Sequence, residues 1–96
     1  MSYNIIVKYL DWNLKKNDWL KKNRNIGFEE VAIALIEGDL LDIIDNPSKN
    51  FPKQKVFVIK INKYIYYIPF VEDEEKFFLK TIIPSRKAIK KYLEKL

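Results

Sequence analysis

The sequence predicts an α+β domain in which two helices precede an antiparallel β-meander of about four strands and a third helix closes the chain. Three observations predict this class. An apolar stripe at helical spacing follows Gly27, runs of β-branched and aromatic residues separated by short turns fill positions 55–83, and a basic amphipathic segment follows Pro84. Strands joined by short turns pair antiparallel, and we expect the helices to cover one face of their sheet.

The first expected element is a helix from Asp11 to about Asn23, with Asp11 as its N-cap. Trp12, Trp19 and Leu20 fall on one side of this helix, and lysines occupy much of the rest. Because the two tryptophans are seven residues apart, we expect both in the core or in a protein interface rather than stacked on bases.

A second helix is expected directly after Gly27. Its apolar residues recur at i, i+3, i+4, i+7 and i+8, which is the spacing of a stripe that faces a core. Gly38 stands where such a helix would end in a left-handed residue. The expected core stripe comprises Phe28, Val31, Ala32, Leu35 and Ile36.

The strands are expected in the middle of the chain. Positions 40–44 form a short apolar run followed by a loop, and positions 55–61 and 64–71 are rich in β-branched and aromatic residues. The dipeptide Asn62-Lys63 between the last two runs predicts a hairpin, although glycine would suit the second turn position better than lysine. After an acidic turn at positions 72–76, the last strand is expected from Phe77 to Ile83.

The closing helix is expected to begin after Pro84, with Ser85 as its cap. Its apolar side would comprise Ala88, Ile89, Tyr92, Leu93 and Leu96. From Lys80 onward the chain carries six basic residues against one acid, Glu94, so a strand end and a helix start together present positive charge. The acidic residues Glu37, Asp39, Asp42 and Asp45 gather instead in the middle of the sequence, and such segregation favours a specific docked face.

The composition limits which kinds of functional site the chain can form. A chain of 96 residues that is 48% hydrophobic suits one domain, over positions 1–96, with one core. Cysteine and histidine are absent, which excludes disulfides and thiolate metal sites and removes the usual general base. Any catalysis would have to use Lys, Arg, Glu, Asp, Tyr or Ser, and we expect no metal and no cofactor. The net charge of +5 permits nucleic-acid binding without requiring it.

The N-terminus does not resemble a secretion signal, since its apolar run at positions 5–7 has only three residues and no small-residue cleavage pattern follows. No apolar run approaches the roughly 20 residues that span a bilayer. We therefore expect a cytoplasmic protein that has no membrane contact.

Three short motifs resemble one protein family. They are Asp11-Trp12-Asn13 followed by Lys16 and Asn17, then Gly27-Phe28-Glu29-Glu30, and above all Ile82-Ile83-Pro84-Ser85-Arg86-Lys87-Ala88. With the order of elements, they resemble the BrnT-type toxins of the RelE/ParE-like toxin group. The similarity extends from about Leu10 to Leu96.

The resemblance implies a bacterial type II toxin that cleaves RNA and inhibits translation. It also implies a protein antitoxin, encoded by an adjacent gene, that neutralises the toxin and through which the complex binds their shared promoter. Lys55 stands where the family tends to place a basic residue, Arg86 and Lys87 match its paired basic residues after the last strand, and Glu72 falls near an acidic position. Family members often have a histidine near the end of the third strand, where this chain has Pro69 and Phe70.

RNA cleavage without a metal needs a base for the 2′-hydroxyl, cations for the phosphorane and an acid for the leaving oxygen. We expect Lys55, Arg86 and Lys87 to hold the phosphate, with Arg86 foremost because its planar fork can grip two oxygens near a helix start. Glu72 or Tyr66 would transfer protons. The further candidates for RNA binding are Lys80, Lys60 and Lys90. Strand alternation puts Lys55 and Lys60 on opposite faces, so both should not reach one site.

Each feature also has a structural interpretation. The C-terminal lysines could be a solvated helix face, and the acidic run from Glu72 to Glu75 a solvated turn. Tyr64, Tyr66 and Tyr67 could stack on bases, but packing across strands is the use that we favour for them. The competing functions are therefore a toxin ribonuclease, a non-catalytic module that binds nucleic acid or protein, and a partner in a larger assembly.

Overall fold

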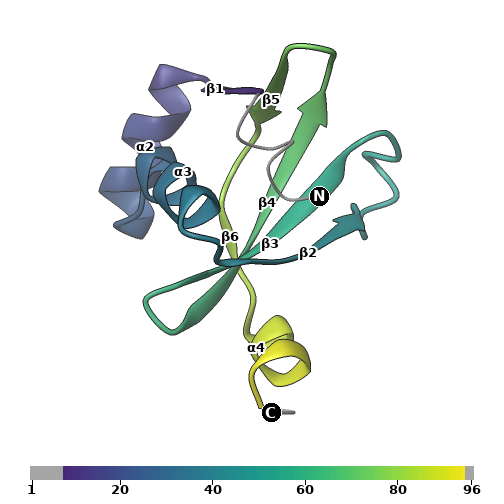
Figure 1. Cartoon of the computed structure of the whole chain (residues 1–96). Helices are drawn as coiled ribbons and strands as arrows, with labels where there is room; N and C mark the ends of the chain where they lie inside the picture. The colour runs from purple at the N-terminus through teal and green to yellow at the C-terminus, as the bar shows by residue number, and fades with distance from the viewer. Residues whose placement is uncertain (1–7, 95–96) are drawn as a thin grey trace.

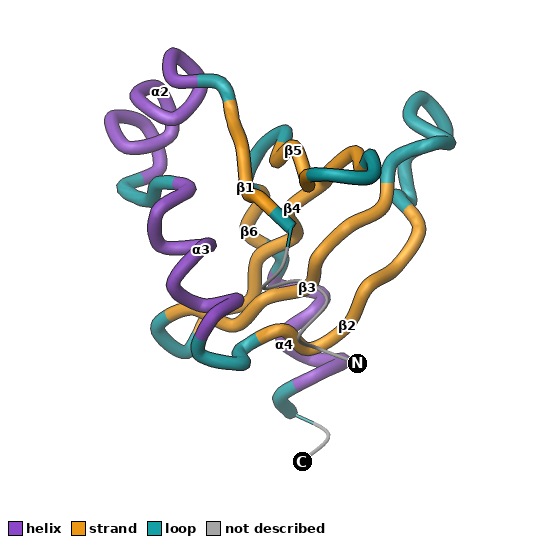
Figure 2. Tube along the Cα trace, turned by 45° about the horizontal axis from the view of Figure 1, so that its top comes forward, coloured by secondary structure: helices purple, strands orange, loops and turns teal. Residues whose placement is uncertain are grey.

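The architecture is described for residues 8–94 by a computed structural model; positions 1–7 and 95–96 lie outside the described residues. The elements run in the order β1 (Tyr9–Trp12), α2 (Leu14–Arg24), α3 (Phe28–Ile36), β2 (Leu40–Asp45), β3 (Lys55–Ile61), β4 (Tyr64–Glu72), β5 (Lys76–Leu79), β6 (Ile83–Pro84) and α4 (Arg86–Tyr92). In both views α2 and α3 lie together beside the sheet, and α4 lies apart from them (Figures 1 and 2). The predicted α+β class is confirmed.

The sheet follows the order β1-β5-β4-β3-β2, and the short β6 also pairs with β4. All pairs are antiparallel except that of β1 with β5, which is parallel. The strands expected at positions 40–44, 55–61 and 64–71 are confirmed. β1 was not predicted, because four residues give no readable alternation and their partner strand lies more than sixty positions away.

The start of the first helix was predicted two residues too early. Asn13, not Asp11, caps α2: its side chain accepts the Lys16 backbone N–H at 2.9 Å. Trp12 therefore belongs to β1 and stacks on Phe28 in the core, with ring centroids 5.6 Å apart. Trp19 is 45% exposed, so the two tryptophans do not share a helix side as predicted.

The junction between α2 and α3 is held by one buried amide. The side-chain oxygen of Asn17 accepts the Phe28 backbone N–H at 2.8 Å, and its amide nitrogen donates to both carboxylate oxygens of Glu29 at 3.0 Å. These bonds, together with the amine of Lys21, lower the pKa of Glu29. Gly27 makes this approach possible, because a Cβ there would lie 2.8 Å from Glu29 and 3.0 Å from Asn17.

The buried stripe of α3 is rotated from the predicted one. Its buried residues are Phe28, Val31, Ala34 and Leu35, at i, i+3, i+6 and i+7. Ala32 is only half-buried, and Ile36, the last residue of the helix, is 71% exposed. The prediction for these two residues was wrong, because the final turn leads the chain away toward β2 instead of lying on the sheet.

The sheet is buried on both faces by two separate clusters. Phe57, Phe70 and Phe77 meet in the larger cluster under α2 and α3, where the Phe57 and Phe70 rings stack with centroids 3.9 Å apart. Val58 and Ile65, which point the other way, pack with Ala88 of α4. The expectation that all helices cover one face was therefore wrong, since α4 covers the face opposite α2 and α3.

The predicted last strand, Phe77 to Ile83, is interrupted by a β-bulge. Leu79 pairs with Phe70, whereas Ile83, four residues later, pairs with Tyr67, only three residues back along β4. The extra residue inverts the alternation, so that Ile82 is buried in the larger cluster and Ile83 is 41% exposed. The chain therefore forms β5 and β6 in place of one continuous strand.

The closing helix is capped as predicted. The Ser85 hydroxyl accepts the Ala88 backbone N–H at 3.1 Å. Ala88 is buried, and Ile89, Tyr92 and Leu93 pack beside it, which confirms most of the predicted apolar side; Leu96 lies outside the described residues. Within residues 8–94 no helix is long and apolar enough to cross a membrane.

The β3–β4 turn is strained at a residue that is not glycine. Asn62 and Lys63 have φ values of 51° and 66°, as a two-residue type I′ turn requires. We expect Lys63→Gly to raise the free energy of unfolding by about 0.5–1 kcal/mol, because glycine adopts a positive φ without a Cβ clash. Thermal and urea unfolding would measure the change. Lys63→Ala removes the same charge but keeps a Cβ, so an equal gain in that variant would contradict the explanation.

Candidate nucleic-acid interface

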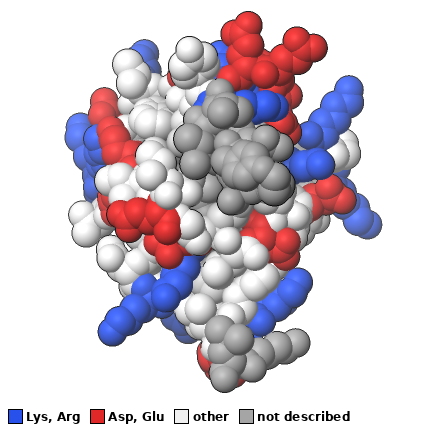
Figure 3. All heavy atoms as spheres, in the orientation of Figure 1, with Lys and Arg blue, Asp and Glu red and all other residues white. Residues whose placement is uncertain are grey.

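Three lysines of α4 line one hollow on the surface of the molecule. Lys87, Lys90 and Lys91 border it with Tyr67 of β4, and its volume is about 440 Å³. The lysines recur at i, i+3 and i+4, so they share one side of the helix. None of them takes part in the three ion pairs that occur among residues 8–94. Figure 3 shows basic side chains projecting from the lower part of the molecule, where α4 lies. This hollow can therefore offer its positive charge to an anionic ligand.

A side-chain hydrogen bond joins α4 to the sheet. The Tyr92 hydroxyl donates to a carboxylate oxygen of Asp42 on β2 at 2.8 Å. Burial and this hydrogen bond raise the pKa of Tyr92 to about 12. With Ala88 packed on Val58 and Ile65, the contact holds one side of α4 on the sheet and leaves the lysines facing solvent.

Arg86 precedes Lys87 in the chain but does not line this hollow. It is the first residue of α4 and is exposed. The helix has only seven residues, so its dipole adds little to the charge of the guanidinium. Of the paired basic residues, Lys87 therefore belongs to the hollow and Arg86 to its surroundings.

Lys55 and Glu72 come together elsewhere, at the far end of the sheet. With Lys53 and Phe70 they line a hollow of about 190 Å³. The amine of Lys8 binds the Glu72 carboxylate and also donates to the Asp73 carbonyl at 3.0 Å. Sequence reasoning missed Lys8, because a lone lysine more than sixty positions away gives no signal of this contact.

Tyr66 is separated from both groups. Phe70 lies four positions further along β4, a distance of about 13 Å along the strand. It packs against the core under α2 and α3, with its ring centroid 5.4 Å from that of Tyr64. Burial, and secondarily the charge of Glu30, raise the pKa of Tyr66, so the hydroxyl is held in the neutral form. The structure does not bring Tyr66 to either hollow as a proton-transfer group.

The remaining candidates also lie apart. Lys60 borders a hollow beside α3 and Lys55 borders a separate one, so the two lysines do not line one site. Lys80 lies beside a mainly apolar hollow near Phe51 and Ile83, and its amine sits 5.2 Å from the centre of the Phe78 ring. Of the RNA-binding candidates named from sequence, only Lys90 shares the α4 hollow.

The acidic run after β4 forms a solvated turn. The Asp73 carboxylate accepts the backbone N–H groups of Glu75 and Lys76 at 2.8 and 2.9 Å, and these bonds lower its pKa. Glu74 and Glu75 are exposed. Along residues 8–94 no three carboxylates come close enough together to hold a metal ion.

Two residues of this hollow, Lys91 and Tyr67, were not among the catalytic and RNA-binding residues predicted from the sequence but could have been recognised there. Lys91 completes the i, i+3, i+4 set that begins at Lys87, and Tyr67 alternates with Tyr66 so that it faces the other side of the sheet. That α4 covers Tyr67's face, and not that of Tyr66, is visible only in the fold.

Comparison with known proteins gives no assignment: no family model, curated protein or solved structure matches this chain. The resemblance to the toxin group therefore stays a prediction.

The anchoring of α4 can be tested by titration. We expect Tyr92→Phe to remove the tyrosine that ionises near pH 12 in the alkaline absorbance profile. The pKa of Tyr92 is higher in the folded than in the unfolded chain, so its stabilising effect is complete below pH 10.0 and is lost as the pH rises toward 12. In that window the variant should lose less stability than the wild type. Tyr9→Phe, at a residue that is 75% exposed, is the control; equal profiles for the two variants would rule out the anchor.

Proposed function

We propose that the chain binds RNA through the hollow formed by Lys87, Lys90, Lys91 and Tyr67, and that it acts as the toxin of a type II toxin–antitoxin pair in the cytoplasm. The observation that carries the proposal is the convergence of three unpaired lysines of the described chain on one aromatic ring. Lysines attract phosphates, and an exposed ring edge accepts an unstacked base.

Single-stranded RNA suits this surface better than a duplex. The hollow is set against the sheet, so a base must leave its stack to reach Tyr67, which bases in loops and single strands do readily. The toxin assignment is supported by the resemblance at positions 82–88, which fall on β6 and the start of α4 directly beside the hollow. A cognate antitoxin from the adjacent gene would neutralise the protein by covering this basic surface.

Removing the three lysine charges should weaken RNA binding. We expect Lys87→Gln/Lys90→Gln/Lys91→Gln to lower affinity for a single-stranded RNA and to reduce the slope of log K against log salt by about 2, at roughly 0.7 per phosphate contact. Fluorescence anisotropy at several salt concentrations would measure both quantities. The matched control is Lys15→Gln/Lys22→Gln/Lys49→Gln, which removes equal charge from other exposed positions. Equal losses in the two variants would mean that net charge, not this hollow, binds RNA.

The toxin role predicts growth arrest that an adjacent gene product relieves. Expression of the chain should stop growth, and co-expression of the neighbouring gene should restore it. Arg86→Ala should abolish the arrest while leaving the fold intact, because Arg86 is exposed and directly precedes Lys87, which lines the RNA surface. Growth, RNA integrity and circular dichroism would be measured together. If the folded Arg86→Ala variant were still fully toxic, Arg86 would not be needed for the toxin function.

RNA cleavage is a second candidate function, and one observation favours it. Glu72 and two lysines share the hollow at the end of β3, where a carboxylate could take the 2′-hydroxyl proton while Lys53 and Lys55 stabilise the phosphorane. Lys8 binds Oε2 of Glu72, so Oε1 is the oxygen that would accept the proton. This hollow lies on the α2/α3 side of the sheet, about 17 Å along β4 from the point where α4 starts. An RNA that occupied both this hollow and the α4 hollow would therefore have to extend around the edge of the sheet.

Cleavage and binding can be separated with labelled RNA and no added metal. If the hollow is catalytic, Lys55→Ala and Glu72→Gln should each lower product formation by about a hundredfold, since a positioned base or cation contributes on that order. Glu74→Gln, in the neighbouring exposed turn, should cleave like the wild type. Salt-sensitive binding by the wild type without any product would assign the chain to the non-catalytic binding modules.

A further inference from the structure

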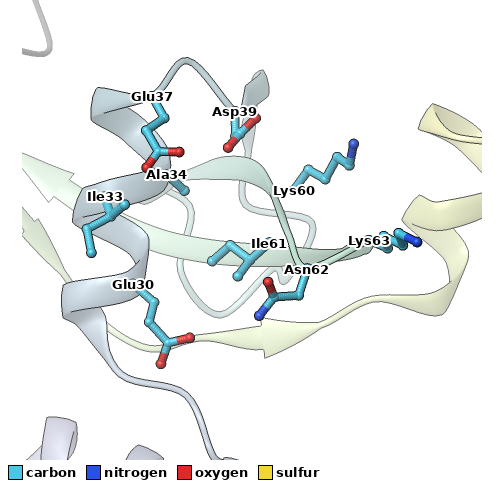
Figure 4. Close-up of a pocket in the computed structure, with 9 residues that line it drawn as sticks. All are labelled: Glu30, Ile33, Ala34, Glu37, Asp39, Lys60, Ile61, Asn62 and Lys63. Atoms are coloured by element: carbon cyan, nitrogen blue, oxygen red, sulfur yellow. The ribbon is translucent and has the colours of Figure 1, made fainter.

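A further hollow lies on the α2/α3 face of the sheet, which is the face opposite α4. It has a volume of about 440 Å³ and is bordered by α3, the start of β2 and the β3–β4 turn. Figure 4 shows Ile33 and Ile61 facing each other across it, Glu37 and Asp39 at one end, and Glu30 at the other. Lys60 and Lys63 also border the hollow, but in Figure 4 their amines point away from it.

The floor of this hollow is apolar and accessible. Ile33 is 54% exposed and Ile61 is half-buried, and the neighbouring Ile36 on α3 is 71% exposed. Single exposed aliphatic side chains are ordinary, but two on one helix beside a concave surface are typical of a protein interface. Burying Ile33 and Ile36 against a partner would stabilise a complex by removing this apolar area from water.

The rim of the hollow is acidic and its charges are not neutralised within the described chain. Glu37 and Asp39 take part in none of the three ion pairs between residues 8 and 94, and in no side-chain hydrogen bond there. Glu30 accepts the Gly27 backbone N–H through Oε1 at 3.1 Å. The three carboxylates do not gather closely enough to hold a metal ion, so they are spaced for several separate cations.

This acidic rim lies on a chain whose net charge is +5. Its carboxylates attract a cationic partner to this hollow. In Figure 3 acidic side chains lie beside uncharged surface on the left of the view, in the area of α3, with basic side chains at the left edge and below them. Charge complementarity therefore indicates the sign of the partner, and the apolar floor distinguishes this hollow from the exposed acidic turn at positions 72–75.

We propose that this hollow docks a segment of a partner protein that carries lysine or arginine on both sides of an aliphatic residue. The aliphatic side chain fits between Ile33 and Ile61, and the flanking cations pair with Glu37 and Asp39 at one end and Glu30 at the other. The site lies on α3 and the hairpin, so it does not depend on RNA binding at α4 or on cleavage at Glu72.

The test uses the full chain and two pools of synthetic peptides. One pool has lysine or arginine on both sides of a leucine, and the other has the same peptides with glutamate in place of each basic residue. We expect saturable binding of the basic pool only, with NMR shift changes confined to α3, the start of β2 and the β3–β4 turn. Glu37→Lys should weaken binding about tenfold or more, and so should Ile33→Ser.

Two matched controls accompany these variants. Glu74→Lys makes the same charge reversal in an exposed turn, and Leu14→Ser makes a similar apolar-to-polar change at a residue that is 74% exposed. Both should bind like the wild type. The proposal is overturned if the basic pool fails to bind, if Glu74→Lys weakens it as much as Glu37→Lys does, or if the shifts map to another surface. Sedimentation that shows self-association lost in Glu37→Lys would also overturn it, because the occupant would then be a second copy of this chain.

Discussion

One extra residue between β5 and β6 decides how the second half of the molecule is arranged. Without it, the alternation that buries Phe77 and Leu79 would bury Ile83; with it, Ile82 enters the core. Arg24 of α2 donates to the Ile82 carbonyl and so ties the bulge to the helical layer. After β6, the Ser85 backbone N–H donates to the Ile65 carbonyl of β4 at 2.9 Å. The chain then turns away from β4, and α4 begins on the face of the sheet opposite α2 and α3.

This arrangement separates the two charged surfaces. The lysines of α4 lie on one face with Tyr67, while the carboxylates of α3 and the following turn lie beside the other. If α4 covered the same face as α3, its lysines would approach Glu30 and Glu37 and would neutralise them. Asp42 is the exception: it lies on the α4 side and binds Tyr92, which anchors the helix. The fold thus places the lysines of α4 and the carboxylates near α3 beside different faces of the sheet, while Lys60 and Lys63 also border the hollow of these carboxylates.

The candidate site shows how far sequence reasoning reaches. The basic character of the last helix and its cap at Ser85 follow from residue types and helical spacing, and both are present in the structure. The five catalytic residues predicted from the sequence do not come together in one site. Lys55 and Glu72 lie at one end of the sheet, Arg86 and Lys87 lie at the other, and Tyr66 lies among core residues. Sequence places each residue on its own element but not the elements relative to one another. Lys8, which binds Glu72, shows the same limit.

The sequence by itself determined much of the local structure: the three helices, the strands at positions 40–44, 55–61 and 64–71, the Asn62-Lys63 turn and most of the apolar side of α4, since these depend on neighbours a few positions apart. Only the tertiary structure decided the parallel pairing of β1, the bulge before β6, the face that α4 covers and the exposure of Ile36. Each of these results from competition between distant segments for the same edge or face of the sheet. Such competition is settled by packing, which leaves no periodic signal in the chain.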